Sequence, residues 1–165
     1  MWNGLMKRFL AAALACASVL IACGVACAAE TAEEFAARTR WWQDARFGMF
    51  IHWGLYALPA RHEWVKKYER ITDADYQPYF DAFDPDLYDP AEWARQARLS
   101  GMKYAVITSK HHEGFCLFDS KFTDYKATNT PAKRDLIKPW VEAFRAEGLK
   151  VGFYYSLLDW HHPSY

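Results

Sequence analysis

The stretch Tyr104-Ala105-Val106-Ile107-Thr108 decides the fold of this chain. It is almost wholly apolar and rich in β-branched residues, a pattern typical of a strand that is buried on both faces of a sheet. Two comparable runs, residues 47–53 and 151–155, lie before and after it in the sequence. We therefore expect three buried strands in this order along the chain.

Helical patterns are predicted in four places: residues 31–46, 73–83, 89–100 and 134–147. The first begins with a capping box formed by Thr31 and Glu34. The third has Asp89 as its N-cap and Gly101 as its stop signal. At the start of the fourth, Asp135 is expected to be the N-cap. Strands and helices therefore alternate along most of the chain.

This alternation predicts an α/β fold in which parallel strands are joined by crossover helices. Two architectures fit the pattern: an open doubly wound sheet and a (β/α)8 barrel. A barrel needs eight βα units and about 250 residues, whereas only three strands are predicted in these 165 residues. If the fold is a barrel, we expect the chain to be a fragment truncated after about three βα units.

The composition favours a folded chain with an uncharged partner. Hydrophobic residues make up 52% of the chain and charged residues 24%, which excludes a disordered chain. The 20 basic and 20 acidic residues cancel, and no long charged block is present. Nucleic acids and anionic membranes are bound through clustered Lys and Arg, so neither is an expected partner.

The first 29 residues have the pattern of a secretory signal peptide. Lys7 and Arg8 precede an apolar run over residues 9–22, and small residues follow up to Ala29. The run is too short to favour a membrane-spanning helix of about 20 residues, and a retained membrane anchor is the alternative interpretation. We expect an exported protein, periplasmic or extracellular, whose folded part is residues 30–165.

Two processing routes stay open at the end of this segment. Ala26-Cys27-Ala28 is an A-x-A cleavage site, whereas Leu20-Ile21-Ala22-Cys23 resembles a bacterial lipobox, which would leave a lipid anchor on Cys23. Cleavage after Ala28 would leave Cys116 as the single cysteine. No disulfide bond is therefore expected within the mature chain.

Aromatic and hydrogen-bonding side chains follow all three predicted strands. His52 follows the first strand, His111 and His112 follow the second, and Tyr154 ends the third. The carboxyl ends of parallel strands meet at one edge, where ligands bind in α/β folds. Imidazole and phenol groups bond to hydroxyls and indoles offer flat apolar faces, so this set suits a neutral polyhydroxylated ligand such as a sugar.

Two further pairs of residues belong to the same edge. Glu63-Trp64, in the loop after the first strand, would add a carboxylate and an indole. Tyr154 and Tyr155 point to opposite sides of their strand. The sequence leaves open which of the two tyrosines faces the ligand.

A metal site is the rival interpretation of these histidines. Zinc sites favour spacings such as H-E-x-x-H, which place two rings on one face. His111 and His112 are adjacent, and we expect adjacent side chains in an extended chain to diverge. His62-Glu63 lacks a second histidine four residues after the first, and no nucleotide-binding glycine motif or G-x-S-x-G elbow is present. We therefore expect no metal ligand and no cofactor.

Several segments resemble the α-L-fucosidases of glycoside hydrolase family 29, in matching order and spacing over residues 41–160. The most specific are Phe47-Gly48-Met49-Phe50-Ile51-His52-Trp53-Gly54 and Lys110-His111-His112-Glu113-Gly114-Phe115. Further matches are residues 101–106, 119–125, 133–136 and 148–156.

The resemblance implies that residues 30–165 form the N-terminal portion of a (β/α)8-like, TIM-type catalytic barrel. The implied activity is hydrolysis of terminal α-linked L-fucose from glycans, with retention of configuration. By position, the residues implied to bind fucose are His52, Glu63, Trp64, His111, His112 and Tyr154. Glu113 stands where the family more often has Asp, which keeps the charge.

Retaining glycosidases need two carboxyl groups, a nucleophile and a general acid/base. In the family these groups follow later strands than the three predicted here, so no catalytic residue is assigned in this chain. We expect the 165-residue chain itself to be inactive and its full-length parent to be the fucosidase. The alternatives are a metal-dependent barrel hydrolase and a non-catalytic glycan-binding protein.

Overall fold

The computed structural model describes residues 29–165. The chain divides into two compact units, residues 1–40 and 41–165, and the sheet and the candidate site belong to the second. The predicted signal segment, with Cys23, lies outside the described residues except for its last residue, so its processing stays a prediction. From residue 29 to 165, no helix has both the length and the apolar character needed to cross a membrane.

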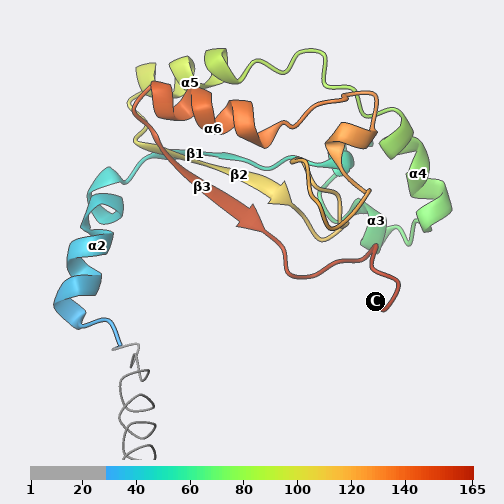
Figure 1. Ribbon diagram of the computed structural model, residues 1–165, viewed down its shortest axis with the longest axis horizontal. Coiled ribbons are helices and arrows are strands. Elements are labelled where there is room, and N and C mark those ends of the chain that lie inside the picture. The colour runs from blue at the N-terminus through green and yellow to red at the C-terminus, as the bar shows by residue number, and fades with distance from the viewer. Residues whose placement is uncertain (1–28) are drawn as a thin grey trace, which may run out of the picture. The chain divides into compact units, whose positions relative to one another are not determined.

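Helix α2, Ala32–Ala45 (Figure 1), begins after the predicted capping box. The backbone N of Glu34 donates to Thr31 Oγ1 at 3.2 Å, and the backbone N of Thr31 donates to Glu34 Oε2 at 2.9 Å. The helix stops before Arg46, whose φ of 51° lies in the left-handed region. The prediction of a helix over residues 31–46 is confirmed to within one residue at each end.

Three parallel strands form one sheet in the order β1-β2-β3, which confirms the α/β class. The strands are β1, Gly48–Ile51, β2, Tyr104–Lys110, and β3, Lys150–Tyr155. β1 is shorter than predicted because the backbone N of Trp53 donates to Thr108 Oγ1, at 2.7 Å, and not to the backbone of β2. β2 runs two residues further than predicted, up to the turn that carries His111.

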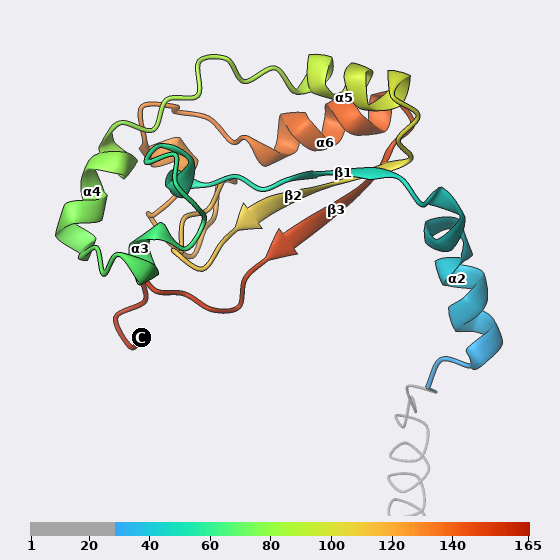
Figure 2. The same cartoon turned by 180° about the vertical axis from the view of Figure 1, so that it is seen from behind.

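Two helices cover one face of the sheet, as both views show (Figures 1 and 2): α5, Pro90–Leu99, and α6, Ile137–Ala146. Asp89 caps α5 as predicted, because its Oδ1 accepts from the backbone N of Glu92 at 3.0 Å. Gly101 follows with a φ of 84°, where a side chain would be strained, and this ends the segment.

The start of α6 lies three residues later than predicted. The Asp135 carboxylate accepts from the backbone N of Ile137 and of Lys138, at 2.8 Å each. The residue in the N-cap position is Leu136, which offers no side-chain hydrogen bond. Asp135 therefore caps the helix from the residue before the N-cap, and not as the N-cap that the sequence predicts.

Shorter elements connect these strands and helices: η1, Leu55–Ala57, α3, Val65–Tyr68, α4, Asp73–Asp81, and η2, Ala127–Asn129. The arrowheads of β2 and β3 point toward the end of the sheet at which α3 and α4 lie (Figure 1). The loops that leave the three strands therefore meet at this end.

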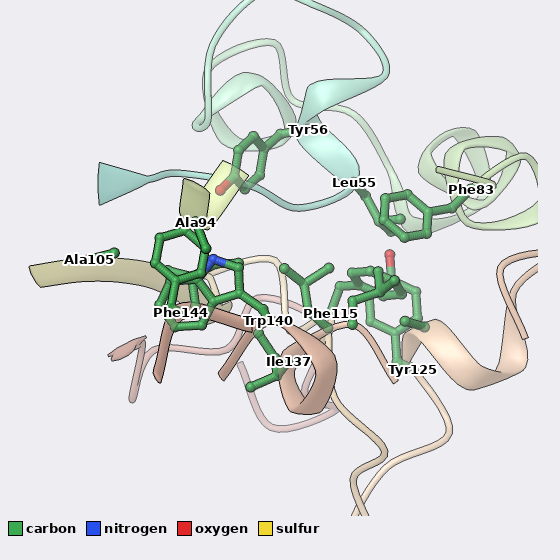
Figure 3. Packing of buried hydrophobic residues seen from close by; sticks show 14 of the residues in the cluster. Leu55, Tyr56, Phe83, Ala94, Ala105, Phe115, Tyr125, Ile137, Trp140 and Phe144 are labelled. Carbon is green, nitrogen blue, oxygen red and sulfur yellow. The ribbon is translucent and has the colours of Figure 1, made fainter. Parts of the chain in front are cut away.

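The helix-covered face of the sheet holds one part of the core. Ala105 of β2 is fully buried there, together with Trp140 and Phe144 of α6 (Figure 3), and Ile107 of β2 is fully buried too. Phe50 of β1 points to the opposite face and is 54% exposed. Within the described part of the chain, the sheet is thus packed on one face by its own helices.

A second group of apolar side chains packs beneath the loops that leave the strands. Leu55, Phe83, Phe115 and Tyr125 belong to it (Figure 3), and each of them is less than one tenth exposed. The rings of Phe83 and Phe115 lie 5.1 Å apart at a steep angle, a favourable edge-to-face arrangement. This packing holds the loops that carry the candidate site.

Candidate functional site

Four of the six predicted ligand-binding residues form one ring cluster at the carboxyl ends of the strands. The ring centres of His52 and His111 lie 4.9 Å apart, and those of His111 and His112 lie 4.3 Å apart. Tyr154 stacks on His111 at 5.7 Å and lies 6.1 Å from His52. Side chains from β1, β2 and β3 therefore converge, and Tyr154 is the tyrosine of its pair that faces the cluster.

The two adjacent histidines point the same way, so the expectation that their rings diverge is wrong. β2 ends at Lys110, and His111 and His112 lie in the turn that follows. The backbone N of Gly114 closes this turn on the His111 carbonyl at 3.1 Å. Even so, residues 29–165 contain no group of three or more His, Cys, Asp or Glu arranged to hold a metal ion.

Glu63 and Trp64 lie at the edge of the cluster, before α3. The Trp64 ring is 5.1 Å from the His112 ring and nearly perpendicular to it. The Glu63 carboxylate is close enough to raise the pKa of His52 and of His112 against the larger opposing effect of burial. Five of the six predicted residues are thus connected by ring contacts, and Glu63 acts on two of the histidines through its charge.

Three residues that the sequence analysis missed also touch the cluster. The Tyr56 hydroxyl lies 2.7 Å from His52 Nδ1. The Trp160 ring lies 5.3 Å from the His112 ring, and Ser156 Oγ lies 2.6 Å from His112 Nδ1. Ser156 directly follows β3, and this position is a signal that could have found it.

The imidazoles of the cluster are uncharged at neutral pH. Burial, reinforced by the neighbouring His112, His52 and Lys110, lowers the pKa of His111 to about 3. Burial also lowers the pKa of His52 and of His112 below the usual value. A neutral imidazole offers one donor and one acceptor, so the cluster can bond to hydroxyl groups without presenting net positive charge.

Lys110 connects the turn after β2 to the loop after β3. It is 6% exposed, and its Nζ lies 3.1 Å from Asp159 Oδ2. It also donates to the carbonyls of Ser156 and Leu158, at 3.2 and 3.3 Å. Three oxygen partners from one loop therefore surround this buried ammonium group, and they fix the chain beyond Tyr154 beside the histidines.

Glu113 connects the same turn to the loop after β1. It is 1% exposed, its Oε1 accepts from the backbone N of Leu55 at 2.9 Å, and its Oε2 accepts from the Tyr76 hydroxyl. A Cβ on Gly54 would lie 2.5 Å from Glu113 Oε1, so this loop can approach only because residue 54 is glycine. Burial raises the pKa of Glu113 to about 7.

The family model and the known proteins that are similar to this chain all point to one family. A family model described as α-L-fucosidase matches residues 25–165. α-L-fucosidase isoenzyme 1 from Paenibacillus thiaminolyticus is a solved structure with 67% identity and a TM-score of 0.76, over 78% of this chain and 30% of that chain.

Two more relatives are similar over a comparable share of the chain. A family 29 α-L-fucosidase from Bacteroides thetaiotaomicron, solved as a trapped covalent intermediate, is 42% identical with a TM-score of 0.72, over 75% of this chain and 31% of that chain. Human plasma α-L-fucosidase is 36% identical over 143 residues, which are 76% of this chain and 31% of the relative.

The chain thus spans about three tenths of the length of these three relatives. The match includes all three strands and the turn that carries His111 and His112. It confirms the family that the sequence motifs predict. This chain belongs to the α-L-fucosidase family of glycoside hydrolases.

Proposed function

We propose that this chain supplies the fucose-binding part of a (β/α)8-like catalytic barrel, and that the whole protein hydrolyses terminal α-L-fucosyl linkages of glycans with retention of configuration. The observation that carries the proposal is the convergence of His52, His111, His112 and Tyr154 from three strand ends. A parallel sheet with its helices on one face supports the barrel, in which the opposite face lines the interior.

The chemistry of the cluster fits a neutral sugar. The three imidazoles are uncharged because burial lowers their pKa values, so they can exchange hydrogen bonds with hydroxyls in either direction. Trp64 borders His112 and would offer apolar surface to the C–H groups and the methyl group of fucose, whereas the buried Trp160, 5.3 Å from Trp64, packs behind it. Glu63 would accept a hydrogen bond from a sugar hydroxyl.

The cleavage step needs two carboxyl groups about 5–5.5 Å apart. We assign neither of them to this chain and expect both to follow later strands of the whole protein. The relative that was trapped as a covalent intermediate supports retention, since retaining glycosidases react through such an intermediate. The part of the chain described here then binds and orients the fucose ring.

The proposed partner is a fucosylated oligosaccharide or glycoconjugate outside the cytoplasm. The basic start and the apolar run of residues 1–29 support export, with residues 30–165 as the partial catalytic domain. Lipid attachment at Cys23 is the alternative to release after Ala28. N-terminal sequencing and mass analysis of the exported protein distinguish the two routes.

The test is hydrolysis of p-nitrophenyl α-L-fucoside by the full translated product of the gene that encodes this chain. We expect hydrolysis, with the α-anomer of fucose released first, and none by the 165-residue chain alone. His111→Ala should lower kcat/KM roughly 10- to 100-fold, because it removes a hydrogen bond inside the pocket.

His162→Ala is the matched control, because His162 is exposed and makes no ring contact with the cluster. We expect this variant to keep the wild-type rate. Activity of His111→Ala at the wild-type level would contradict the assignment of His111 to the fucose pocket. Binding of fucose without hydrolysis by the full product would favour a glycan-binding protein. Stoichiometric zinc, with activity lost on chelation, would favour a metal-dependent hydrolase.

A further inference from the structure

His112 makes a hydrogen bond whose direction the surrounding atoms determine. Its Nδ1 lies 2.6 Å from Ser156 Oγ, and the same Oγ lies 2.9 Å from the Leu158 carbonyl oxygen. A serine hydroxyl has one proton, and a carbonyl oxygen can only accept. If the hydroxyl donates to Leu158, Nδ1 of His112 must carry the proton of the 2.6 Å contact.

The opposite assignment is less favourable. If Ser156 donated to Nδ1, two oxygens 2.9 Å apart would face each other without a proton between them. Lys110 Nζ, 3.3 Å from the Leu158 oxygen, could offset part of that repulsion. Only the first assignment, however, makes both short contacts hydrogen bonds.

The Ser156 hydroxyl is held in place by the main chain and by burial. Its backbone N donates to the Lys110 carbonyl at 2.9 Å, and its own carbonyl accepts from Lys110 Nζ at 3.2 Å. The residue is 4% exposed, so water does not compete freely for the hydroxyl. Ser156 is therefore a fixed acceptor for one nitrogen of a half-buried ring.

We propose that Ser156 is a positioning residue that keeps the proton of neutral His112 on Nδ1, so that Nε2 presents a lone pair to the ligand. The ligand part rests on the proposed function: a fucose hydroxyl would donate to Nε2 of His112. His111 has no such partner, because its buried Nδ1 has no hydrogen bond among the described residues. The two adjacent rings therefore differ in how their tautomers are set.

The test is the ¹⁵N spectrum of the imidazoles in the full translated gene product, labelled at histidine and recorded at neutral pH. Loss of a signal pair in His112→Gln assigns His112. In the wild type we expect a protonated Nδ1 and an unprotonated Nε2, with the same pattern in Ser156→Thr. Ser156→Ala should shift His112 toward the Nε2–H form and leave His111 unchanged.

Hydrolysis of p-nitrophenyl α-L-fucoside tests the ligand part separately. Ser156→Ala should raise KM about tenfold with a smaller change in kcat, and Ser156→Thr should restore KM. A wild-type His112 in the Nε2–H form, or a Ser156→Ala spectrum like the wild type, overturns the assignment. A shifted tautomer with an unchanged KM overturns the ligand part, whereas a wild type with the expected spectrum and no hydrolysis refutes the proposed function alone.

Discussion

The segment of residues 110–113 has a buried ionisable residue at each end, and the two residues have different partners. Lys110 and Glu113 are both almost fully buried, at 6% and 1% exposure. The Lys110 ammonium meets a carboxylate, that of Asp159, and two carbonyls. The Glu113 carboxylate accepts hydrogen bonds from neutral donors, among them the backbone N of Leu55 and the hydroxyl of Tyr76.

The difference shows that burial alone does not decide how an ionisable group behaves. A buried charge is stable when an opposite charge and hydrogen bonds replace its water. Glu113 has the hydrogen bonds but no bonded cation, and burial raises its pKa to about 7. His111 and His112 lie between Lys110 and Glu113. The loop after β3 is held by the ion pair of Lys110, and the loop after β1 is held by Glu113, whose carboxyl group titrates near neutral pH.

The largest effect is expected when the ion pair is broken. Lys110→Met would leave the Asp159 carboxylate and two carbonyls without their shared donor. We expect the free energy of unfolding to fall by about 3–4 kcal/mol, measured by urea denaturation.

Arg95→Ala is the control for this variant, because Arg95 pairs with Glu92 on the exposed surface of α5. An exposed pair contributes less than about 1 kcal/mol. Equal losses in Lys110→Met and Arg95→Ala would show that the buried ion pair does not hold the loop.

The next effect concerns pH. The folded-state pKa of Glu113, about 7, lies above the ordinary value of 4.5, so the folded chain binds this proton more tightly than the unfolded chain does. The stabilisation of the folded state by this proton is fully present below about pH 4.5 and is lost as the pH rises through 7. We expect Glu113→Gln to remove about 3 kcal/mol of this pH dependence, measured as unfolding free energy from pH 4.5 to 8.

Glu92→Gln serves as the control for that measurement. Hydrogen bonds from Arg95 and Gln96 lower the pKa of exposed Glu92 to about 2, so its titration lies below the window. This variant should keep the wild-type slope between pH 5 and 7. If Glu113→Gln kept that slope too, Glu113 would not be the group that titrates there.

The smallest effect is expected from Tyr76→Phe, which removes one donor from Glu113. We expect a loss of about 1 kcal/mol in unfolding free energy. Because this donor favours the ionised carboxylate, the pH at which stability falls should also move upward. A midpoint that stays in place or moves down would mean that Tyr76 does not stabilise the charged form.

Much of the architecture could be predicted because it depends on local chemistry. Thr31 with Glu34, Asp89 and Gly101 mark helix ends through hydrogen bonds within a few residues, and the structure has them where the pattern predicts. The adjacency of His111 and His112 misled the prediction, since the strand pattern says nothing of the turn that aligns the rings.

The sequence alone determined the α/β class and the family motifs, and it singled out the four residues of the ring cluster, since each depends on residue type and order. Only the tertiary structure decided that Ser156, Tyr56 and Trp160 join them, and that Lys110 and Glu113 end up buried. These contacts join residues as much as 58 positions apart, as in the bond from Leu55 to Glu113. Their energies depend on distance and burial, and neither quantity exists until the strands are side by side.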